Sequence, residues 1–221
     1  MDHRAGDPPP ALDAKKKTLT AAERDEGARL TFAYDVLFHL DPNDLVSVDE
    51  AAATLALTRL YARAPRGERA FGSVPRNHPT ATTLITALCP TGIQAAMTLV
   101  GAVDKLAFRV FARDVLGPTL RPGQVVAVDN LSIHADPQVQ AIIEDHDCTL
   151  IRLPTYSPDL APVEPAIAKI KASLRKAAAR TQETLDQAIT NALASITPED
   201  AQGFFRHAGY PLPAESSCSP L

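Results

Sequence analysis

Residues 125–129 of the chain read Val125-Val126-Ala127-Val128-Asp129, a run of apolar and mostly β-branched residues that ends in a carboxylate. Residues 45–49 repeat the pattern as Leu45-Val46-Ser47-Val48-Asp49. Short runs of this composition are typical of strands that are buried in a sheet covered on both faces. We therefore expect two strands of one sheet, each ending in an aspartate.

Helical and strand patterns surround these two runs. Between them, strands over 55–61, 82–88 and 96–100 and the turn Pro90-Thr91-Gly92 predict an antiparallel meander of three or four strands. A capping-box pattern at Thr20 to Glu23 predicts a helix over about 20–40. Further helices are expected over 106–115, 139–143, 163–174 and 185–196 and from Thr197 onward, with a strand over 150–153. The predicted fold is α/β, with a mixed central sheet flanked by helices.

Length and composition favour one compact domain. A chain of 221 residues, 45% hydrophobic and 22% charged, can bury one full core. We expect a disordered or linker tail over 1–19, a helical lead-in over 20–44, the folded domain over 45–210 and a disordered tail over 211–221. The three cysteines are too scattered for a zinc site. With no apolar leader and no run of about 18 apolar residues, we expect a cytoplasmic protein without a membrane partner.

Three carboxylates are candidate metal ligands. Asp49 and Asp129 each close an apolar run, and ligands of such sheets bind outside the strand ends. Glu164 opens a helix beside its apolar stripe. Three carboxylates in one partly buried cleft require counter-charge, and hard oxygen ligands suit Mg²⁺ or Mn²⁺. Two such ions can cut and join nucleic acid. Taken singly, these residues are more often turn formers or helix caps, so the argument rests on their combination.

Other polar residues lie near these acids in the sequence. Asn130 and His134 follow Asp129 closely enough to contact phosphate or water beside a metal, and Asp159 lies in the loop before Glu164, from where it could assist. For His134, a histidine that bonds a loop carbonyl is an equally good interpretation.

Two basic clusters are candidates for binding DNA. Lys169, Lys171, Arg175 and Lys176 lie, with Arg180, on the predicted helix of Glu164, and Arg63, Arg66, Arg69 and Arg76 lie in the strand and turn region. A solvated surface is the alternative for both. Because the formal net charge is -4, binding by the whole surface is disfavoured and DNA must meet a local patch.

Three segments, 45–50, 125–134 and 153–164, together resemble the DDE superfamily endonuclease domain of bacterial insertion-sequence transposases related to mariner. The resemblance covers about residues 15–210, and the 34 residues between Asp129 and Glu164 are similar to the spacing of the second and third acids in that group. It implies an RNase H-like fold and a metal-binding triad of Asp49, Asp129 and Glu164 with two Mg²⁺ or Mn²⁺ ions. It also implies the transposon ends and target DNA as substrates.

One residue and one short segment depart from that family's pattern. Ala161 stands where asparagine is usual, and Glu50-Ala51-Ala52-Ala53 stands where a Thr or Ser and a Gly are more usual. Family members also carry an N-terminal helix-turn-helix region, so we expect a truncated chain or one product of a split gene. It would work with a separate helix-turn-helix subunit and associate with itself on DNA. The alternatives are a non-catalytic remnant that binds DNA or regulates a transposase, and a different RNase H-like nuclease acting on branched DNA or RNA–DNA hybrids.

Overall fold

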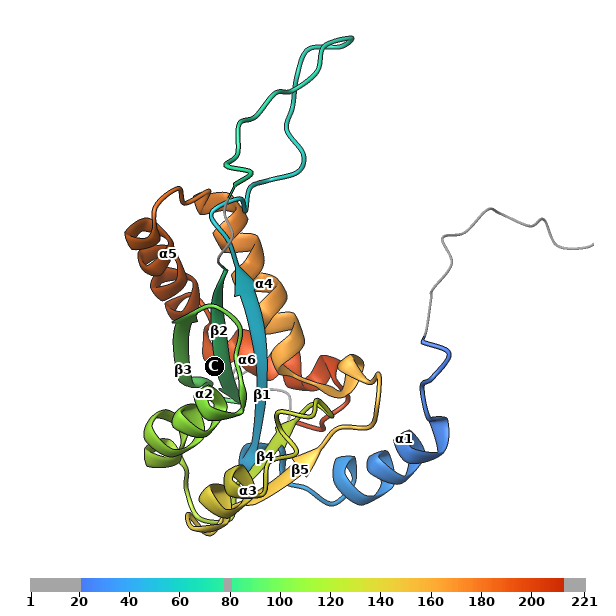
Figure 1. Ribbon diagram of the computed structural model, residues 1–221. Helices are drawn as coiled ribbons and strands as arrows, with labels where there is room; N and C mark the ends of the chain where they lie inside the picture. Colours follow the sequence, from blue (N-terminus) through green and yellow to red (C-terminus); the bar gives the residue numbers. More distant parts are fainter. Residues whose placement is uncertain (1–20, 78–80, 213–221) are drawn as a thin grey trace, which may run out of the picture.

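The computed structural model describes residues 21–77 and 81–212, so the tail predicted over 1–19 and most of the one predicted over 211–221 lie outside the described residues. A central sheet has helices on both faces, and a long arm leaves one end of the molecule (Figure 1). The elements in chain order are α1 (Glu26–Phe32) with a π-helical turn (Ala33–Leu37), β1 (Leu45–Ala53), β2 (Thr82–Cys89), β3 (Gly92–Val100), α2 (Lys105–Val110) with a π-helical turn (Phe111–Leu116), β4 (Val125–Val128), α3 (Pro137–Glu144), β5 (Thr149–Arg152), α4 (Val163–Ala177), α5 (Gln182–Ala194) and α6 (Pro198–His207).

The sheet is mixed, as the sequence predicts. Its strand order is β3-β2-β1-β4-β5. The hairpin partners β1, β2 and β3 pair antiparallel, whereas β4 joins β1 and β5 joins β4 in parallel. The two parallel strands arrive through connections that contain helices, which is the usual requirement for parallel pairing.

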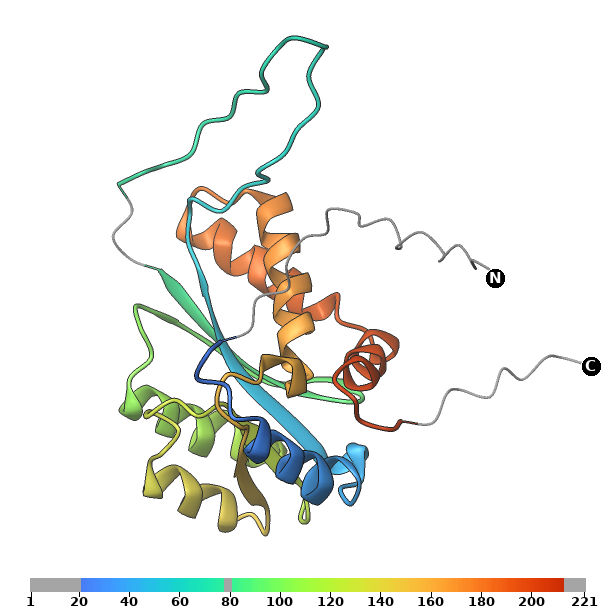
Figure 2. The same ribbon diagram turned by 90° about the vertical axis from the view of Figure 1, so that its right-hand side faces the viewer.

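Side-chain alternation along β1 divides the apolar interior into two cores. Leu45, Ala51 and Ala53 face one core, which α4, α5 and α6 complete, while Val46 and Val48 face the other, which α2 and α3 complete. Figure 2 shows these two helical layers on opposite sides of the sheet. The odd-numbered residues of β1 therefore point toward α4, and this places Asp49 on that face.

The strand predicted over 55–61 is wrong. Residues 54–77 contain no helix or strand and form the projecting arm (Figure 1). The alternating apolar residues of 55–61 find no ladder partner, because β2 already occupies one edge of β1 and β4 the other. The segment stays outside the sheet, where the carbonyls of Leu55 and Leu57 accept hydrogen bonds from the Arg180 guanidinium in place of a strand. Leu60 and Tyr61 remain 81% and 90% exposed.

The first helix is shorter than predicted. It begins at Glu26, because the carboxylate of Asp25 accepts a hydrogen bond from the Ala28 N–H and caps it. The capping-box pattern at Thr20 starts in residues that are not described. The last helix begins as predicted, with Thr197 as its cap and Pro198 at its first position. Within the described residues no helix is both long and apolar enough to cross a membrane.

We predict that Thr86→Val stabilises the protein. The Thr86 hydroxyl is fully buried and has no hydrogen-bond partner among the described residues, and valine replaces it with a methyl group of similar size. The expected gain is about 1 kcal/mol in the free energy of unfolding, measured by urea denaturation.

The matched control for Thr86→Val is Thr83→Val, on the same strand. Thr83 donates a hydrogen bond to the Gly101 carbonyl, so its replacement should lower stability by about 1 kcal/mol. Destabilisation by Thr86→Val would contradict the prediction and would mean that ordered water pairs with the hydroxyl.

Candidate active site

Asp49 and Asp129 meet where the parallel pairing of β1 with β4 ends. The last paired residues of these strands are Ser47 and Ala127, and each aspartate lies two residues beyond, on the face that carries α4. Asp129 directly follows β4, as predicted. Asp49 does not close β1, contrary to prediction, because antiparallel pairing with β2 carries β1 on to Ala53. The two acids still converge, since it is β4 that ends there.

Glu164 brings a third carboxylate to the same place. It is the second residue of α4, whose buried stripe packs on the sheet beside β1. All three acids line one cavity of about 300 Å³. The loop after β5, residues 153–158, forms most of the remaining wall with Ala161, which is buried and packs into the core behind the cavity.

Two of the carboxylates in the cavity have pKa values shifted in opposite directions. Burial raises the pKa of Asp49 to about 7, and the carboxylates of Glu164, Glu50 and Asp129 add to the rise, while the hydrogen bond from the Glu50 N–H opposes it. Burial also acts to raise the pKa of Asp129, but hydrogen bonds from His134 and the Leu131 N–H outweigh it, so this pKa lies below its usual range.

A buried histidine connects Asp129 to Glu50. The side chain of His134 is fully buried; its Nδ1 lies 2.6 Å from Oδ1 of Asp129 and its Nε2 lies 2.9 Å from Oε1 of Glu50. Burial acts to lower the pKa of His134, but its two carboxylate partners outweigh burial and raise the pKa to about 9. The raised pKa favours the protonated ring, which donates from both nitrogens. The Asp129 carbonyl lies farther away, at 3.3 Å, so a bond to a loop carbonyl is the minor contact of His134.

Sequence reasoning missed the role of Glu50. The sequence marks it only as part of a departure from the family pattern. The available signal was the alternation of β1, which sends Glu50 to the opposite face from Asp49, where it meets the segment that follows β4. Its neighbours Ala51 and Ala53 are buried core residues.

Asn130 and Asp159 take different places around the cavity. Asn130 lines it and donates a hydrogen bond to the Thr155 hydroxyl, which ties the end of β4 to the loop after β5. Asp159 is turned toward α1, where Arg29 holds it with two hydrogen bonds of 3.0 and 2.7 Å. The structure therefore brings Asn130, but not Asp159, to the three acids.

Tyr156 is a cavity residue that sequence reasoning also left unassigned. It is 56% exposed and has a φ of 52°. A left-handed backbone is unfavourable for an aromatic residue, and such strain is concentrated at functional sites.

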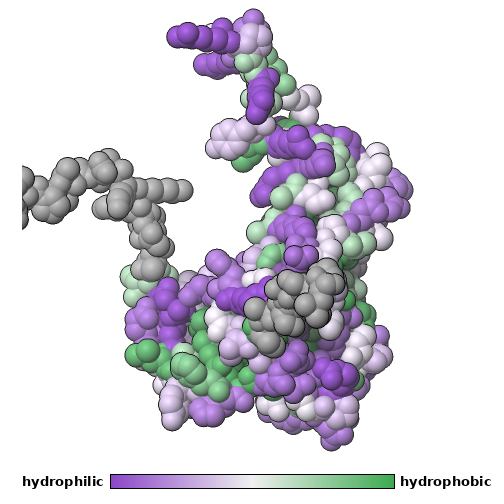
Figure 3. Space-filling view, turned by 180° about the vertical axis from the view of Figure 1, so that it is seen from behind, coloured by the Kyte–Doolittle hydropathy of each residue, from purple (hydrophilic) through white to green (hydrophobic). Residues whose placement is uncertain are grey.

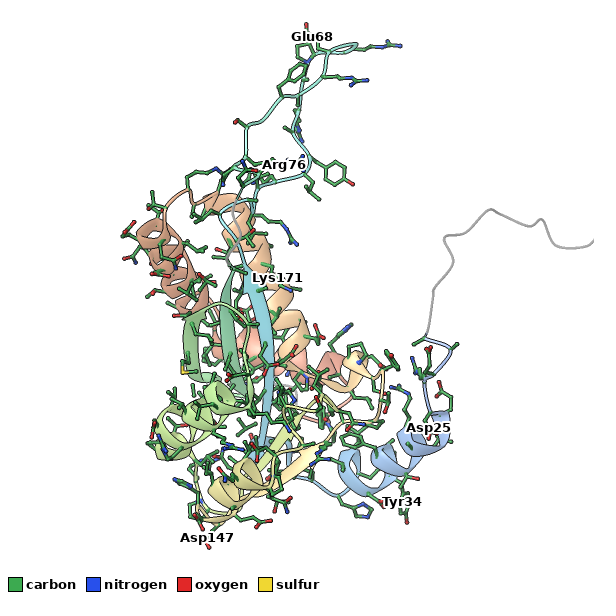
Figure 4. The ribbon with its side chains drawn as sticks, viewed as in Figure 1. Asp25, Tyr34, Glu68, Arg76, Asp147 and Lys171 are labelled. Atoms are coloured by element: carbon green, nitrogen blue, oxygen red, sulfur yellow. The ribbon has the colours of Figure 1, made fainter. Side chains whose placement is uncertain are left out.

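The basic residues of α4 lie on different faces. Lys171 and Arg175 are seven and eleven residues from Glu164, which is close to whole helical turns and places them on its face. Figure 4 shows Lys171 midway along α4. Lys169 is instead bound to Asp200 and the Ser195 carbonyl, and Lys176 is exposed farther around the helix.

The second basic cluster occupies the arm. Within 54–77 the charged residues are one glutamate, Glu68, and five arginines: Arg59, Arg63, Arg66, Arg69 and Arg76. None of these arginines takes part in an ion pair within the part of the chain that the structure describes. Glu68 lies at the tip and Arg76 nearer the base (Figure 4), and from behind the arm is mostly hydrophilic (Figure 3).

The donor set of the cavity fits a hard divalent cation. Three carboxylates supply only oxygen ligands, and the pKa of Asp49, raised by burial and further by the neighbouring carboxylates, reflects a cost of ionisation that a cation would relieve. Among the described residues, no group of three or more His, Cys, Asp or Glu side chains is gathered closely enough to hold a metal. Coordination of one ion by all three acids would require their side chains to lie closer together.

Comparison with solved structures defines the class of the fold. The chain is similar to the Mos1 mariner paired-end complex with Mn, with a TM-score of 0.71 and 17% identity over 89% of this chain and 64% of that chain. It is also similar to the Mos1 transposase catalytic domain with raltegravir and Mn, with a TM-score of 0.62 and 16% identity over 86% of this chain and 92% of that one. The mixed sheet with its flanking helices is thus the RNase H-like fold of a mariner transposase catalytic domain.

The family follows from the sequence match. The model of the family described as DDE superfamily endonuclease matches residues 44–186, which is well over half of the chain. The protein belongs to this family. No curated protein matches the sequence.

We predict that Asp49→Asn stabilises the metal-free protein. Because the pKa of Asp49 is about 7 in the folded state and about 4 when unfolded, its ionisation costs stability increasingly as the pH rises from about 4 to about 7. The full cost persists above that range. Asparagine removes it, so the free energy of unfolding at pH 8 in EDTA should rise by about 2 to 4 kcal/mol, the upper figure being the full effect of about three pKa units.

The measurement for Asp49→Asn is urea denaturation across this pH range, with Asp35→Asn as the control. Asp35 is exposed on the turn after α1, and its replacement should leave stability within about 0.5 kcal/mol. A stability gain for Asp49→Asn that does not grow with pH would contradict the electrostatic origin.

Proposed function

We propose that the protein is a metal-dependent DNA endonuclease and strand-transferase, the catalytic domain of a DDE transposase. The observation that carries the proposal is the convergence of Asp49, Asp129 and Glu164 on one cavity at the edge of an RNase H-like sheet. The family match supports the nuclease class. The Mos1 structures with Mn and with Mg support a divalent metal.

In this proposal Asp49, Asp129 and Glu164 hold two Mg²⁺ or Mn²⁺ ions. Such ions activate a water or a 3′-hydroxyl and stabilise the departing oxygen of a phosphodiester. The protein's own contribution is placement. The backbone of β1, the end of β4 and the first turn of α4 bring the acids together, and the apolar cores on both sides of the sheet keep those elements rigid.

DNA would reach the cavity along α4. Lys171 and Arg175 lie about 10 and 16 Å from Glu164 along the helix, at 1.5 Å per residue. These positions let a strand whose phosphate is at the cavity continue over cationic side chains. The arm supplies further positive charge, with five arginines against one glutamate in a chain of net charge -4. We propose transposon ends and target DNA as the substrates. The chain would associate with itself on DNA, and a separate helix-turn-helix subunit would recognise the transposon ends.

We predict metal-dependent nicking of a labelled DNA duplex by the purified 221-residue chain. Cleavage should require Mg²⁺ or Mn²⁺ and should fall at least 100-fold in Asp129→Asn, because one ligand of the ions is lost. Asp35→Asn is the control, since Asp35 is exposed on the turn after α1 and does not line the cavity; it should retain most of the activity.

The outcomes of the nicking assay separate the candidate functions. Preference for branched DNA or RNA–DNA hybrids would support a different nuclease of this fold. The absence of cleavage with every metal, together with no Asp129-dependent metal binding in calorimetry, would contradict the proposal and favour a DNA-binding remnant.

We predict that Lys171 and Arg175 bind DNA through phosphates. The double replacement of both by alanine should weaken binding about tenfold at 100 mM salt and lower the slope of log K against log salt by about 2. The measurement is fluorescence anisotropy with a labelled duplex over a salt series.

The control for this double variant removes two charges elsewhere. Lys176 is exposed on another face of α4 than Glu164, and Lys105 is exposed at the start of α2. Their joint replacement should therefore have a smaller effect on DNA affinity. Equal losses in the two double variants would show that only net charge matters.

A further inference from the structure

The relative position of Asp49 and Asp129 is not set by backbone pairing. The β1–β4 ladder ends at the Ser47–Ala127 pair, and both acids lie beyond it. Asp129 also lies beyond the end of β4. A side-chain contact between β1 and the segment after β4 would therefore add to the control of the separation of the two carboxylates.

The bridge from Glu50 through His134 to Asp129 is that contact. It starts on β1, one residue after Asp49, and ends on the carboxylate of Asp129, with distances of 2.9 and 2.6 Å at its two steps. The His134 ring also packs on Phe108 of α2, with 4.4 Å between the ring centroids. Since the His134 side chain is fully buried, packing limits the rotation of the ring and makes the bridge stiff.

We propose that Glu50 and His134 are positioning residues, which hold the carboxylate of Asp129 in register with Asp49 so that both acids face one divalent cation. The inference rests on the proposed function, because it needs that cation. Glu50 acts through His134 rather than by binding metal itself, since alternation along β1 turns its side chain to the face opposite Asp49. Residues that orient metal ligands in this way commonly change metal affinity by 10- to 100-fold.

The test is Mn²⁺ binding to the full chain, measured by calorimetry and by electron paramagnetic resonance of free Mn²⁺. Glu50→Ala removes the acceptor for His134 Nε2 and should weaken Mn²⁺ binding about tenfold or more. Glu50→Gln keeps an oxygen acceptor at the same reach and should retain most of the affinity. The control is Val46→Ala, a buried change on the same face of β1 that lowers stability without touching the bridge and should leave Mn²⁺ affinity unchanged.

A double-variant cycle distinguishes positioning from general destabilisation. If Glu50 acts through His134, Glu50→Ala should have no further effect on Mn²⁺ affinity in a His134→Ala background. Additive losses, or an unchanged affinity in Glu50→Ala, would overturn the inference. So would an equal loss in Val46→Ala, because it would show that stability alone controls binding.

A second measurement does not depend on metal or on a variant with a lost acceptor. In the metal-free protein, proton NMR should show slowly exchanging, downfield imidazole N–H signals from His134, because its ring is buried between two carboxylates. Glu50→Gln should shift the Nε2–H signal and leave the other in place. If these signals are present but Mn²⁺ does not bind the unaltered chain, the proposed function fails. If Mn²⁺ binds in an Asp129-dependent way and Glu50→Ala changes nothing, only the positioning inference fails.

Discussion

Like-charged carboxylates gathered at the edge of a hydrophobic sheet are the constraint on which the rest of this structure depends. Apolar cores on both sides hold β1, β4 and α4 so firmly that Asp49 cannot move away from Glu164 and Asp129. The chain offsets part of this repulsion through His134, a buried cation that neutralises one side of Asp129. Among the described residues Asp49 has no such partner, so the residual strain is concentrated where a divalent cation would be held.

The parts of this arrangement that local patterns encode could be predicted from the sequence. Short β-branched runs with a terminal acid correctly placed β4 and Asp129, and the apolar stripe of 163–174 correctly placed α4 with Glu164 at its first turn. Convergence of the three acids on one cavity also follows from topology, because the mixed sheet sets β4 beside β1. The elements and their acids depend on periodicity, which a single sequence expresses, whereas the adjacency of β1 and β4 was an assumption of the sequence argument that the structure confirms.

The parts that depend on long-range competition could not be predicted. Nothing local distinguishes 55–61 from a strand; it fails because β2 and β4 have already taken both edges of β1. The same competition extends β1 past Asp49. Glu50 and His134 are 84 residues apart, and Arg29 and Asp159 are 130 residues apart. Tertiary packing, not spacing along the chain, therefore decides which carboxylate pairs with each basic side chain.

The Arg29–Asp159 pair also shows how the cavity wall is held from outside the sheet. Asp159 belongs to the short 3₁₀ turn Pro158–Leu160, which lies between the cavity-lining loop and α4. The Arg29 side chain is only 12% exposed and donates to both carboxylate oxygens of Asp159, and such a two-bond pair is stronger than an ordinary surface ion pair. Meanwhile Phe32 enters the core, and Leu30, Tyr34 and Phe38 face outward. Displacement of α1 would therefore act through Asp159 on the loop whose residues 153–158 line the cavity together with the three acids.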